Sequence, residues 1–285
     1  MTRLLYTSDL HGSQAHYLRL LTVAESLKPD LVVLGGDLLP DDSAIDPKVL
    51  GHGQPEYVRT QFRENIVNLR ESSGCKDVLV IFGNHDWASS VPAMEELARA
   101  DLVTILSHTR RVRVDGLSFL GYSCTPPTPW FVKDFERLDK PGDRPPLLGG
   151  ACWNSRFSRP VHHGAEVLFE DVKTIAEELA VVRAPADPWV FVIHAPPLGT
   201  NLDRAYGNKS YGSQAVREAL ETHQPLMSLH GHIHESPTVS GSWRDQLGKT
   251  TAINPGQNSR SLCYVFAEID VGAGKIVSVE SGQQA

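Results

Sequence analysis

The sequence predicts an α/β fold with a partly parallel central sheet. Short apolar runs, typical of buried strands, alternate with segments in which apolar residues recur at helical spacing. Each early apolar run stops at a glycine or a polar residue, as strands do where they enter a loop. A chain that alternates strand and helix returns to the same end of the sheet before each strand, so neighbouring strands pair in parallel.

The first half of the chain contains three strand–helix pairs. The strands are apolar runs that end at Asp9, at Gly35 and Gly36, and at Gly83. After the first of them, apolar residues recur at helical spacing from Tyr17 onward. In order, the predicted elements are strand 3–9, helix 17–27, strand 31–37, helix 56–71, strand 78–86 and helix 91–100.

The second half repeats this alternation less regularly. It begins with a predicted amphipathic helix marked by Leu168, Val172, Ile175 and Leu179. A strand, a helix and a strand follow at 189–197, 213–222 and 226–234. The stretch 263–281 has Gly272 and Gly274 in its middle, which predicts a β-hairpin. Such late antiparallel strands indicate a mixed sheet or a second sheet packed on the first.

Length and composition indicate one globular domain over residues 1–285. A chain of 285 residues is long enough for a large core, and 41% hydrophobic and 21% charged residues are ordinary values for a globular protein. The net charge of -7 and the pI near 5.9 argue against a general nucleic-acid binder, which usually carries a basic face. Nucleic acid is therefore not the expected partner.

The expected location is the cytoplasm. The N-terminus, MTRLLYTSDLHG, has one arginine and only a short apolar run before an aspartate, unlike a secretory signal. No apolar stretch approaches the length that crosses a bilayer. The cysteines match no zinc-finger spacing and are predicted to be reduced thiols, buried or half-buried: Cys75, Cys124, Cys152 and Cys263.

One segment, at about 123–164, breaks the periodic pattern. It is rich in proline and contains three aromatic residues that either stack on a nucleobase or, as we slightly prefer, pack the loop onto the body: Trp130, Phe131 and Trp153. Long irregular loops in compact enzymes are usually functional, so we predict an ordered loop that faces the substrate. His162 and His163 in this loop are expected to face either the substrate or the solvent. Outside this loop, Asn208 and Tyr211 are expected either to contact substrate or to cap the helix that follows them.

Polar residues gather directly after the predicted strands. The set comprises Asp9, His11, Asp37, Asn84, His85, Asp86, His194, His232 and His234. Because the carboxyl ends of the strands line the ligand crevice in open α/β sheets, these residues are expected to meet in space. Carboxylates, an amide oxygen and four or five imidazoles are too many ligands for one tetrahedral zinc. They suit two moderately hard transition-metal ions, such as Mn, Fe, Co, Ni or Zn.

Five motifs carry a resemblance to a known family. DLH, GGD, GNHD, VIHAPP and GHIH occur in this order, each at the end of a predicted strand, between Asp9 and His234. Together they resemble the calcineurin-like metallophosphoesterase superfamily, although each alone is a weak signal. INPGQ and the TPPTPW loop are similar to its small, mostly prokaryotic Icc-like group. The resemblance implies a four-layer αββα sandwich, with two mixed β-sheets flanked by helices.

The resemblance also implies a role for each motif residue. One metal ion would be bound by Asp9, His11 and His234, the other by Asn84, His194 and His232, and Asp37 would bridge them. His85 would lie near the leaving group, and Asp86 would orient its imidazole through a hydrogen bond. The cofactors would be two divalent transition-metal ions, with Mn as first choice and Fe, Zn, Ni or Co as alternatives. His230 is expected to be structural or to support a ligand.

The implied function is hydrolysis of a small phosphate ester by a hydroxide that bridges the two metal ions. A phosphodiester, for example a cyclic nucleotide, is the favoured substrate class, and a phosphomonoester is the alternative. A different class of function is a non-catalytic scaffold that keeps the fold and binds a partner. Scaffolds tend to lose metal ligands or the leaving-group histidine, whereas this chain keeps them all. Exposed apolar loop residues could also serve a homo-oligomer interface.

Overall fold

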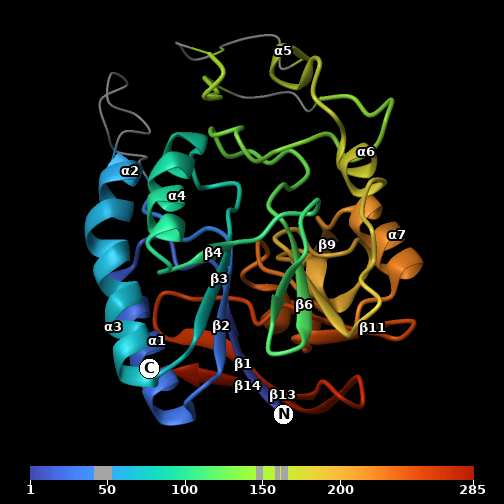
Figure 1. Cartoon of the computed structure of the whole chain (residues 1–285). Coiled ribbons are helices and arrows are strands. Elements are labelled where there is room, and N and C mark those ends of the chain that lie inside the picture. The colour runs from blue at the N-terminus through green and yellow to red at the C-terminus, as the bar shows by residue number, and fades with distance from the viewer. Residues whose placement is uncertain (42–52, 146–149, 158–160, 162–165) are drawn as a thin grey trace.

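The computed structural model describes residues 1–285 except 42–52, 146–149, 158–160 and 162–165 (Figure 1). Its first half contains the three predicted strand–helix pairs. The elements are β1 (Thr2–Thr7), α1 (Gln14–Leu27), β2 (Leu31–Gly35), α2 (Gly53–Tyr57), α3 (Arg63–Ser73), β3 (Asp77–Ile81), α4 (Val91–Arg99) and β4 (Thr104–Ile105). A π-helical stretch, Val58–Phe62, joins α2 to α3, so both belong to the single helix predicted at 56–71.

The second half supplies a second set of strands and shorter helices. The elements are β5 (Val112–Val114), β6 (Leu117–Tyr122), α5 (Glu166–Phe169), α6 (Ile175–Leu179), β7 (Trp189–Ile193), β8 (Arg204–Ala205), β9 (Lys209–Ser210), α7 (Gln214–His223), β10 (Met227–Leu229), α8 (Ser236–Ser240), β11 (Arg244–Leu247), β12 (Thr250–Ile253), β13 (Leu262–Asp270) and β14 (Lys275–Gln284). Two short 3₁₀ turns, Ala88–Ser90 and Asn201–Asp203, lie in the connecting loops.

The strands form two six-stranded mixed sheets. The order in the first is β14-β13-β1-β2-β3-β4, and in the second β11-β12-β10-β7-β6-β5. In each sheet the central strands are parallel and antiparallel strands complete the sheet. The predicted hairpin 263–281 is confirmed as β13–β14. It extends the first sheet next to β1, and the second sheet comes from β5–β7 and β10–β12.

Alternation along the strands creates three apolar layers. Leu5 and Val80 point to α1, α3 and α4, whereas Leu4 and Leu79, one residue away, point to the other sheet. On the far side of the second sheet, Phe191 packs with residues of α6 and α7. Helices, sheet, sheet and helices therefore follow one another, with α1–α4 and α6–α7 on opposite sides (Figure 1). The predicted four-layer sandwich with two mixed sheets is confirmed.

The single amphipathic helix predicted from Leu168 to Leu179 is wrong. The chain forms two short helices, α5 and α6, separated by a turn in which Asp171 has a left-handed φ of 55°. Thr174 then starts a new helix, because its hydroxyl accepts from the backbone N–H of Glu177 while the Glu177 carboxylate accepts from the N–H of Thr174. The apolar spacing indicated burial correctly, but the local capping residues interrupted the helix.

Two further expectations concern the whole chain. The four cysteines are unpaired and buried, as predicted. Among the described residues, no helix combines the length and apolarity that crossing a bilayer requires. The prediction for His162 and His163 lies outside the described residues.

Candidate metal centre

The strand-end residues converge at one place between the two sheets. Asp9, Asp37 and Asn84 follow β1, β2 and β3 of the first sheet, and His194 and His232 follow β7 and β10 of the second. The site is built where the carboxyl ends of parallel strands meet, as in other open α/β sheets. Residues more than two hundred positions apart are therefore in contact: the backbone N–H of His232 donates to Asp9 Oδ1 over 3.0 Å.

Four of the side chains form a compact group. Donor atoms of Asp9, His11, Asp37 and His234 all lie within 4.8 Å of one another. His234 Nε2 is 3.2 Å from Asp9 Oδ1 and 3.3 Å from His11 Nε2. Two imidazole nitrogens and two carboxylates that face a common point form a donor set suited to a divalent transition metal.

Two further histidines lie beside this group. His194 Nε2 is 3.2 Å from Asp37 Oδ2, and His194 Nδ1 donates to Gly35 O over 2.8 Å. Since a carbonyl only accepts, Nδ1 carries a proton in this hydrogen bond, and Nε2 is the nitrogen that faces the site. The ring of His232 lies beside that of His194, with centroids 5.4 Å apart. Asp37 Oδ2 therefore lies within 4 Å of both His194 Nε2 and His11 Nε2.

Unpartnered buried atoms test whether the site fits metal ions. Asn84 Oδ1 and His194 Nε2 are buried and have no hydrogen-bond partner in the described part of the chain. Such atoms are costly unless another ligand satisfies them. Both atoms belong to the donor set, so the residues present fit bound cations.

The electrostatics of the site also favour a cation. Burial would raise the pKa of Asp9, but the neighbouring His234 and His194 hold it below its usual range. Burial lowers the pKa of His194, yet Asp37 and Asp9 raise it to about 9. Burial lowers the pKa of His232 to about 3, which leaves a neutral imidazole with a free lone pair. Two buried carboxylates thus attract positive charge to the point where neutral nitrogen donors are also present.

Strained backbone is concentrated at the same residues. Four members of the set have left-handed φ angles without being glycine: Asp9 at 58°, His11 at 44°, Asp37 at 51° and His232 at 68°. Non-glycine residues rarely adopt this conformation, and it tends to occur at functional sites. The loops are held in place because the N–H of Asp9 donates to Gly36 O and the N–H of His11 to Asp37 O, both over 2.9 Å.

Comparison with known protein families gives the chain its classification. The family model for calcineurin-like phosphoesterases matches residues 2–236. The chain belongs to the calcineurin-like phosphoesterase family. The family predicted from the five motifs is therefore confirmed.

Individual relatives of this phosphoesterase are distant. A Caenorhabditis elegans protein, UPF0046 protein K07C11.7, is 36% identical over 84 residues, which cover 29% of this chain and 27% of that protein. The match thus spans about a quarter of the relative's length. Among solved structures, one neighbour has a TM-score of 0.63 at 16% identity and covers 100% of this chain and 99% of its own. The protein TT1561 of Thermus thermophilus has a TM-score of 0.55 at 16% identity, covering 99% and 98%. These structures support the fold.

The predicted role of Asp86 in this phosphoesterase is wrong. Its carboxylate does not contact His85 but accepts from the backbone N–H groups of Leu38, Leu39 and Gly83, at 2.9 to 3.4 Å. Asp86 thereby ties the loop after β3 to the loop after β2. The hydrogen bond to the imidazole comes from the other loop, where Asp41 Oδ1 is 2.8 Å from His85 Nδ1. The family resemblance implied this role for Asp86, but the Asp86 carboxylate is bound by backbone N–H groups instead.

Asp41 is a site residue that sequence reasoning missed. Besides His85, its carboxylate reaches His11 Nδ1 at 3.5 Å, so it contacts residues of two motifs. Together with His11 and His85 it forms a second group whose donor atoms could hold a cation at the rim. The only signal available in the sequence was an acidic residue four positions after Asp37.

The irregular loop is anchored against the phosphoesterase site. Trp130 stacks on His85 with ring centroids 4.1 Å apart and an angle of 15°. Phe131 and Trp153 pack around Trp87, with centroids 6.2 and 6.4 Å from it. The aromatics therefore pack the loop onto the body, as we preferred, and Trp130 also covers one face of the His85 imidazole.

The INPGQ motif has a structural explanation. Asn254 Nδ2 lies 3.1 to 3.2 Å from the carbonyl oxygens of Leu202, Gly231 and Ile233. Gln257 Nε2 donates to Ser8 O over 3.0 Å. These two amides brace the loops that carry the metal-site residues after β10 and β1.

His230 does not face the metal site. Its Nδ1 is 2.9 Å from the carbonyl oxygens of Ile193 and Ala195, and its Nε2 is 2.9 Å from Ser228 Oγ. The ring is buried, and burial lowers its pKa to about 4. The expectation of a structural role agrees with these contacts.

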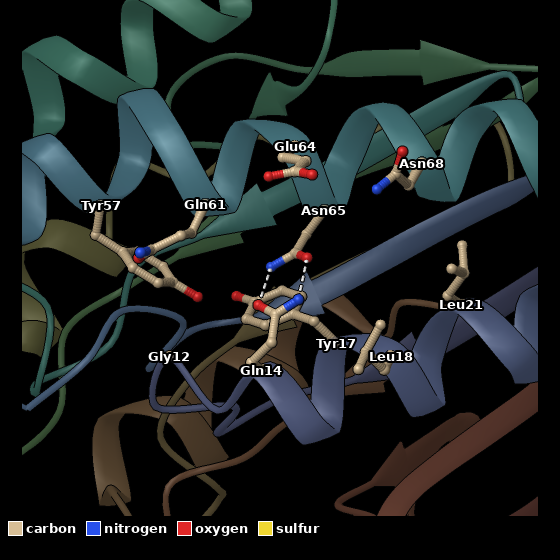
Figure 2. A pocket seen from close by; sticks show the side chains of 10 residues that line it. All are labelled: Gly12, Gln14, Tyr17, Leu18, Leu21, Tyr57, Gln61, Glu64, Asn65 and Asn68. Carbon is tan, nitrogen blue, oxygen red and sulfur yellow. Dashed lines mark hydrogen bonds between the residues drawn. The ribbon is translucent and has the colours of Figure 1, made fainter.

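A cavity with a volume of about 480 Å³ lies between α1 and α3. Figure 2 shows the side chains that line it. Gln14 and Asn65 bridge it with two amide hydrogen bonds of 3.0 and 3.1 Å. Among the described residues that line it, only Gly12 is adjacent in sequence to a metal-site residue, His11. None of the described metal-site side chains lines it. This cavity is therefore not part of the site.

We expect Gly83→Ala to weaken metal binding without unfolding the protein. A Cβ atom at Gly83 would overlap Asp37 Oδ1 and lie 2.6 Å from His194 Nε2, so both donors must move. Displacing positioned ligands should lower metal affinity by about 10- to 100-fold, as loss of supporting contacts does. Competition titration with a metal indicator measures this. Gly272→Ala is the control, because its nearest contact would be an ordinary 3.5 Å. Unchanged affinity for Gly83→Ala would contradict the geometry.

Proposed function

We propose that the protein is a dinuclear metal-dependent phosphodiesterase that hydrolyses a small phosphodiester. The observation that carries this proposal is the position of Asp37, whose Oδ2 is 3.2 Å from His194 Nε2 and 3.9 Å from His11 Nε2. One carboxylate thus lies between two donor sets. A bridging carboxylate with further ligands on each side is the arrangement that two-metal hydrolases use.

The proposed ligands are the side chains that the geometry brings together. Asp9, His11 and His234 would hold one ion, Asn84, His194 and His232 the other, and Asp37 would bridge them. When bound, divalent cations would withdraw charge from the phosphoryl oxygens and lower the pKa of a water molecule. Mn is the first candidate, with Fe, Zn, Ni or Co as alternatives, because the set mixes nitrogen and oxygen donors.

His85 is the proposed donor to the leaving group. Its Nδ1 is engaged by Asp41, and Trp130 covers one ring face, so Nε2 is the atom left to act. A hydrogen bond or proton given by Nε2 to the departing oxygen would stabilise the charge that develops there. Asp41 and Trp130 are positioning residues, since they fix the ring without touching substrate.

The charge at the rim favours a diester over a monoester. Asp41 adds a third carboxylate beside Asp9 and Asp37, within 3.5 Å of both His11 and His85. A phosphomonoester carries a charge of about -1.5 to -2 at pH 7, whereas a diester carries one negative charge. An additional carboxylate repels the more highly charged substrate more strongly.

The test compares hydrolysis of bis-p-nitrophenyl phosphate with that of p-nitrophenyl phosphate. Metal-stripped protein is refilled with Mn, Ni, Zn or Mg, and Asp37→Asn serves as the blank. Faster diester cleavage that vanishes in the variant is the expected result. Faster monoester cleavage would overturn the diester proposal in favour of a phosphomonoesterase. No turnover by protein that has taken up metal would favour the scaffold.

A cytoplasmic location is part of the proposal. All four cysteines are unpaired thiols, as expected in a reducing compartment. Fractionation of the source cells would test it, and recovery of the protein outside the cytoplasm would refute it.

We expect Asp41→Ala to lower kcat by about 10- to 100-fold, the usual effect of losing a partner that orients a site histidine. Because Asp41 is proposed to act through His85, its removal should cost little once His85 is already alanine. The measurement is a double-mutant cycle of Asp41→Ala and His85→Ala, with metal content determined for each protein. Additive losses would show that Asp41 acts independently of His85. Asp41→Asn, which keeps an acceptor oxygen, should restore part of kcat.

A further inference from the structure

A cavity of about 530 Å³ adjoins the metal-site residues on the second-sheet side. One of its walls includes His232, whose backbone N–H contacts Asp9. The proline-rich segment 126–129, residues of the β8–β9 hairpin and Tyr211, which directly follows β9, also line it. A molecule whose phosphoryl group lies at the metal site can therefore extend directly into this cavity.

The lining is apolar and carries no positive charge of its own. The lining includes Ile233, Tyr211 and the prolines of segment 126–129. Apart from His232, the only ionisable groups are the Tyr211 phenol and the Glu235 carboxylate, and no lysine or arginine of the described residues lines the cavity. A second phosphate or a carboxylate would enter without a partner, which is unfavourable. An uncharged ring would instead bury apolar surface.

An ion pair and several hydrogen bonds hold the residues that line the cavity in place. Lys133 and Glu136 form an ion pair of 2.8 Å with fully buried side chains. Lys133 Nζ donates to Thr128 O over 2.8 Å and to Trp130 O, and Glu136 accepts from Thr128 N over 3.1 Å. On the hairpin side, buried Asp203 accepts from Gly199 N and Gly212 N at 2.9 and 3.2 Å. A cavity held in this way loses little entropy when a ligand binds.

Tyr211 does not cap the following helix. Ser213 does so, accepting from the N–H of Val216 over 3.0 Å. The side chain of Tyr211 is 51% exposed although it is large and partly apolar. Tyr211 was predicted either to contact substrate or to cap the helix. Ser213 is the cap, so the ring of Tyr211 is available to a ligand.

We propose that this cavity binds the organic group of the substrate ester, and that this group is an uncharged aromatic ring that packs between Tyr211 and the prolines at 126–129. The inference rests on the proposed function, because the phosphoryl group must lie at the metal site. It goes further by naming the class of ester: a phosphodiester that carries an uncharged aryl or heteroaryl group close to phosphorus.

Binding of non-hydrolysable phosphonates tests the inference without using turnover. Mn-loaded protein is titrated calorimetrically with methylphosphonate, phenylphosphonate and 4-phosphonobenzoate. We expect phenylphosphonate to bind about tenfold or more tightly than methylphosphonate, since ring stacking and burial are worth at least that factor. The added carboxylate of 4-phosphonobenzoate should cancel the gain, because no cation of the described residues lines the cavity.

Variants locate the ring. In Tyr211→Ala, the ratio of the dissociation constants of methylphosphonate and phenylphosphonate should fall to about one. Tyr211→Phe should restore the wild-type ratio. Tyr206→Ala is the matched control: this tyrosine is 72% exposed in the same hairpin but does not line the cavity, so the ratio should not change. A ratio that persists in Tyr211→Ala would place the ring elsewhere and overturn the inference.

The experiment distinguishes a failure of this inference from a failure of the proposed function. Equal binding of methyl- and phenylphosphonate by the wild-type protein would overturn the inference and leave the proposed function intact. If the Mn-loaded protein binds neither phosphonate, the inference fails, whereas the proposed function fails only if the same protein also does not hydrolyse bis-p-nitrophenyl phosphate.

Discussion

Replacing Asp37 with asparagine should abolish both metal binding and turnover. Asp37 Oδ1 accepts from the backbone N–H of His85 over 2.8 Å, and asparagine keeps an oxygen there. Asparagine also tolerates the left-handed φ of 51°. The substitution therefore removes the charge between the two donor sets while the fold is retained. Because metal ions contribute several kcal/mol to such reactions, we expect turnover to fall by about 10³-fold or more.

The measurement is the metal content per chain, by mass spectrometry, alongside diester hydrolysis. Metal content should drop from about two ions to less than one, as expected when a bridging ligand is lost. Asp101→Asn is the matched control, because Asp101 has a similar left-handed φ of 55° and lies at the exposed end of α4. An Asp37→Asn protein that keeps both ions would show that Asp37 does not bridge them.

His85→Ala should reduce turnover by about 10²- to 10⁴-fold, the usual contribution of general acid catalysis, while the metal content stays unchanged. His85 is not in the compact four-residue donor group, and its Nδ1 is held by Asp41. The loss should depend on the leaving group. An ester with a p-nitrophenyl group needs little help from an acid, whereas one with a simple alkyl group needs much.

Two diesters with leaving groups of different acidity measure this dependence. The ratio of wild-type to variant kcat should be far larger for the poorer leaving group. His223→Ala, on α7 and outside the site, should behave as wild type with both. Equal losses for the two esters, or loss of metal, would contradict the assigned role of His85.

The sequence predicted most of the fold because burial is encoded locally. The continuous apolar runs of β1, β2 and β3 indicate strands buried on both faces, and glycine or polar residues indicate where each strand ends. The strand-end rule then brought Asp9 and His194 together, although 185 positions separate them in the numbering. The one error in a long element, the helix from 168 to 179, arose where capping by Thr174 outweighed apolar spacing.

The spacing of residues in the sequence did not predict which side chains are in contact with each other. The family resemblance assigned Asp86 to His85, but the Asp86 carboxylate accepts from three backbone N–H groups, and Asp41 contacts His85 instead. The buried Lys133–Glu136 pair and the cavity beside His232 also leave no periodic signal. That residues 1–285 form a single domain stays a prediction.

The sequence by itself thus determined the family, the alternation of strands and helices and the types of donor atoms at the strand ends, because each depends on a local pattern of burial and chemistry. The four layers of the sandwich followed only from the resemblance to the family. Only the tertiary structure decided the partner of His85, the packing of Trp130 against it and the apolar character of the adjoining cavity. These depend on the orientation of side chains from loops distant in sequence. Orientation is set by competition among many contacts of similar free energy, which no single stretch of sequence encodes.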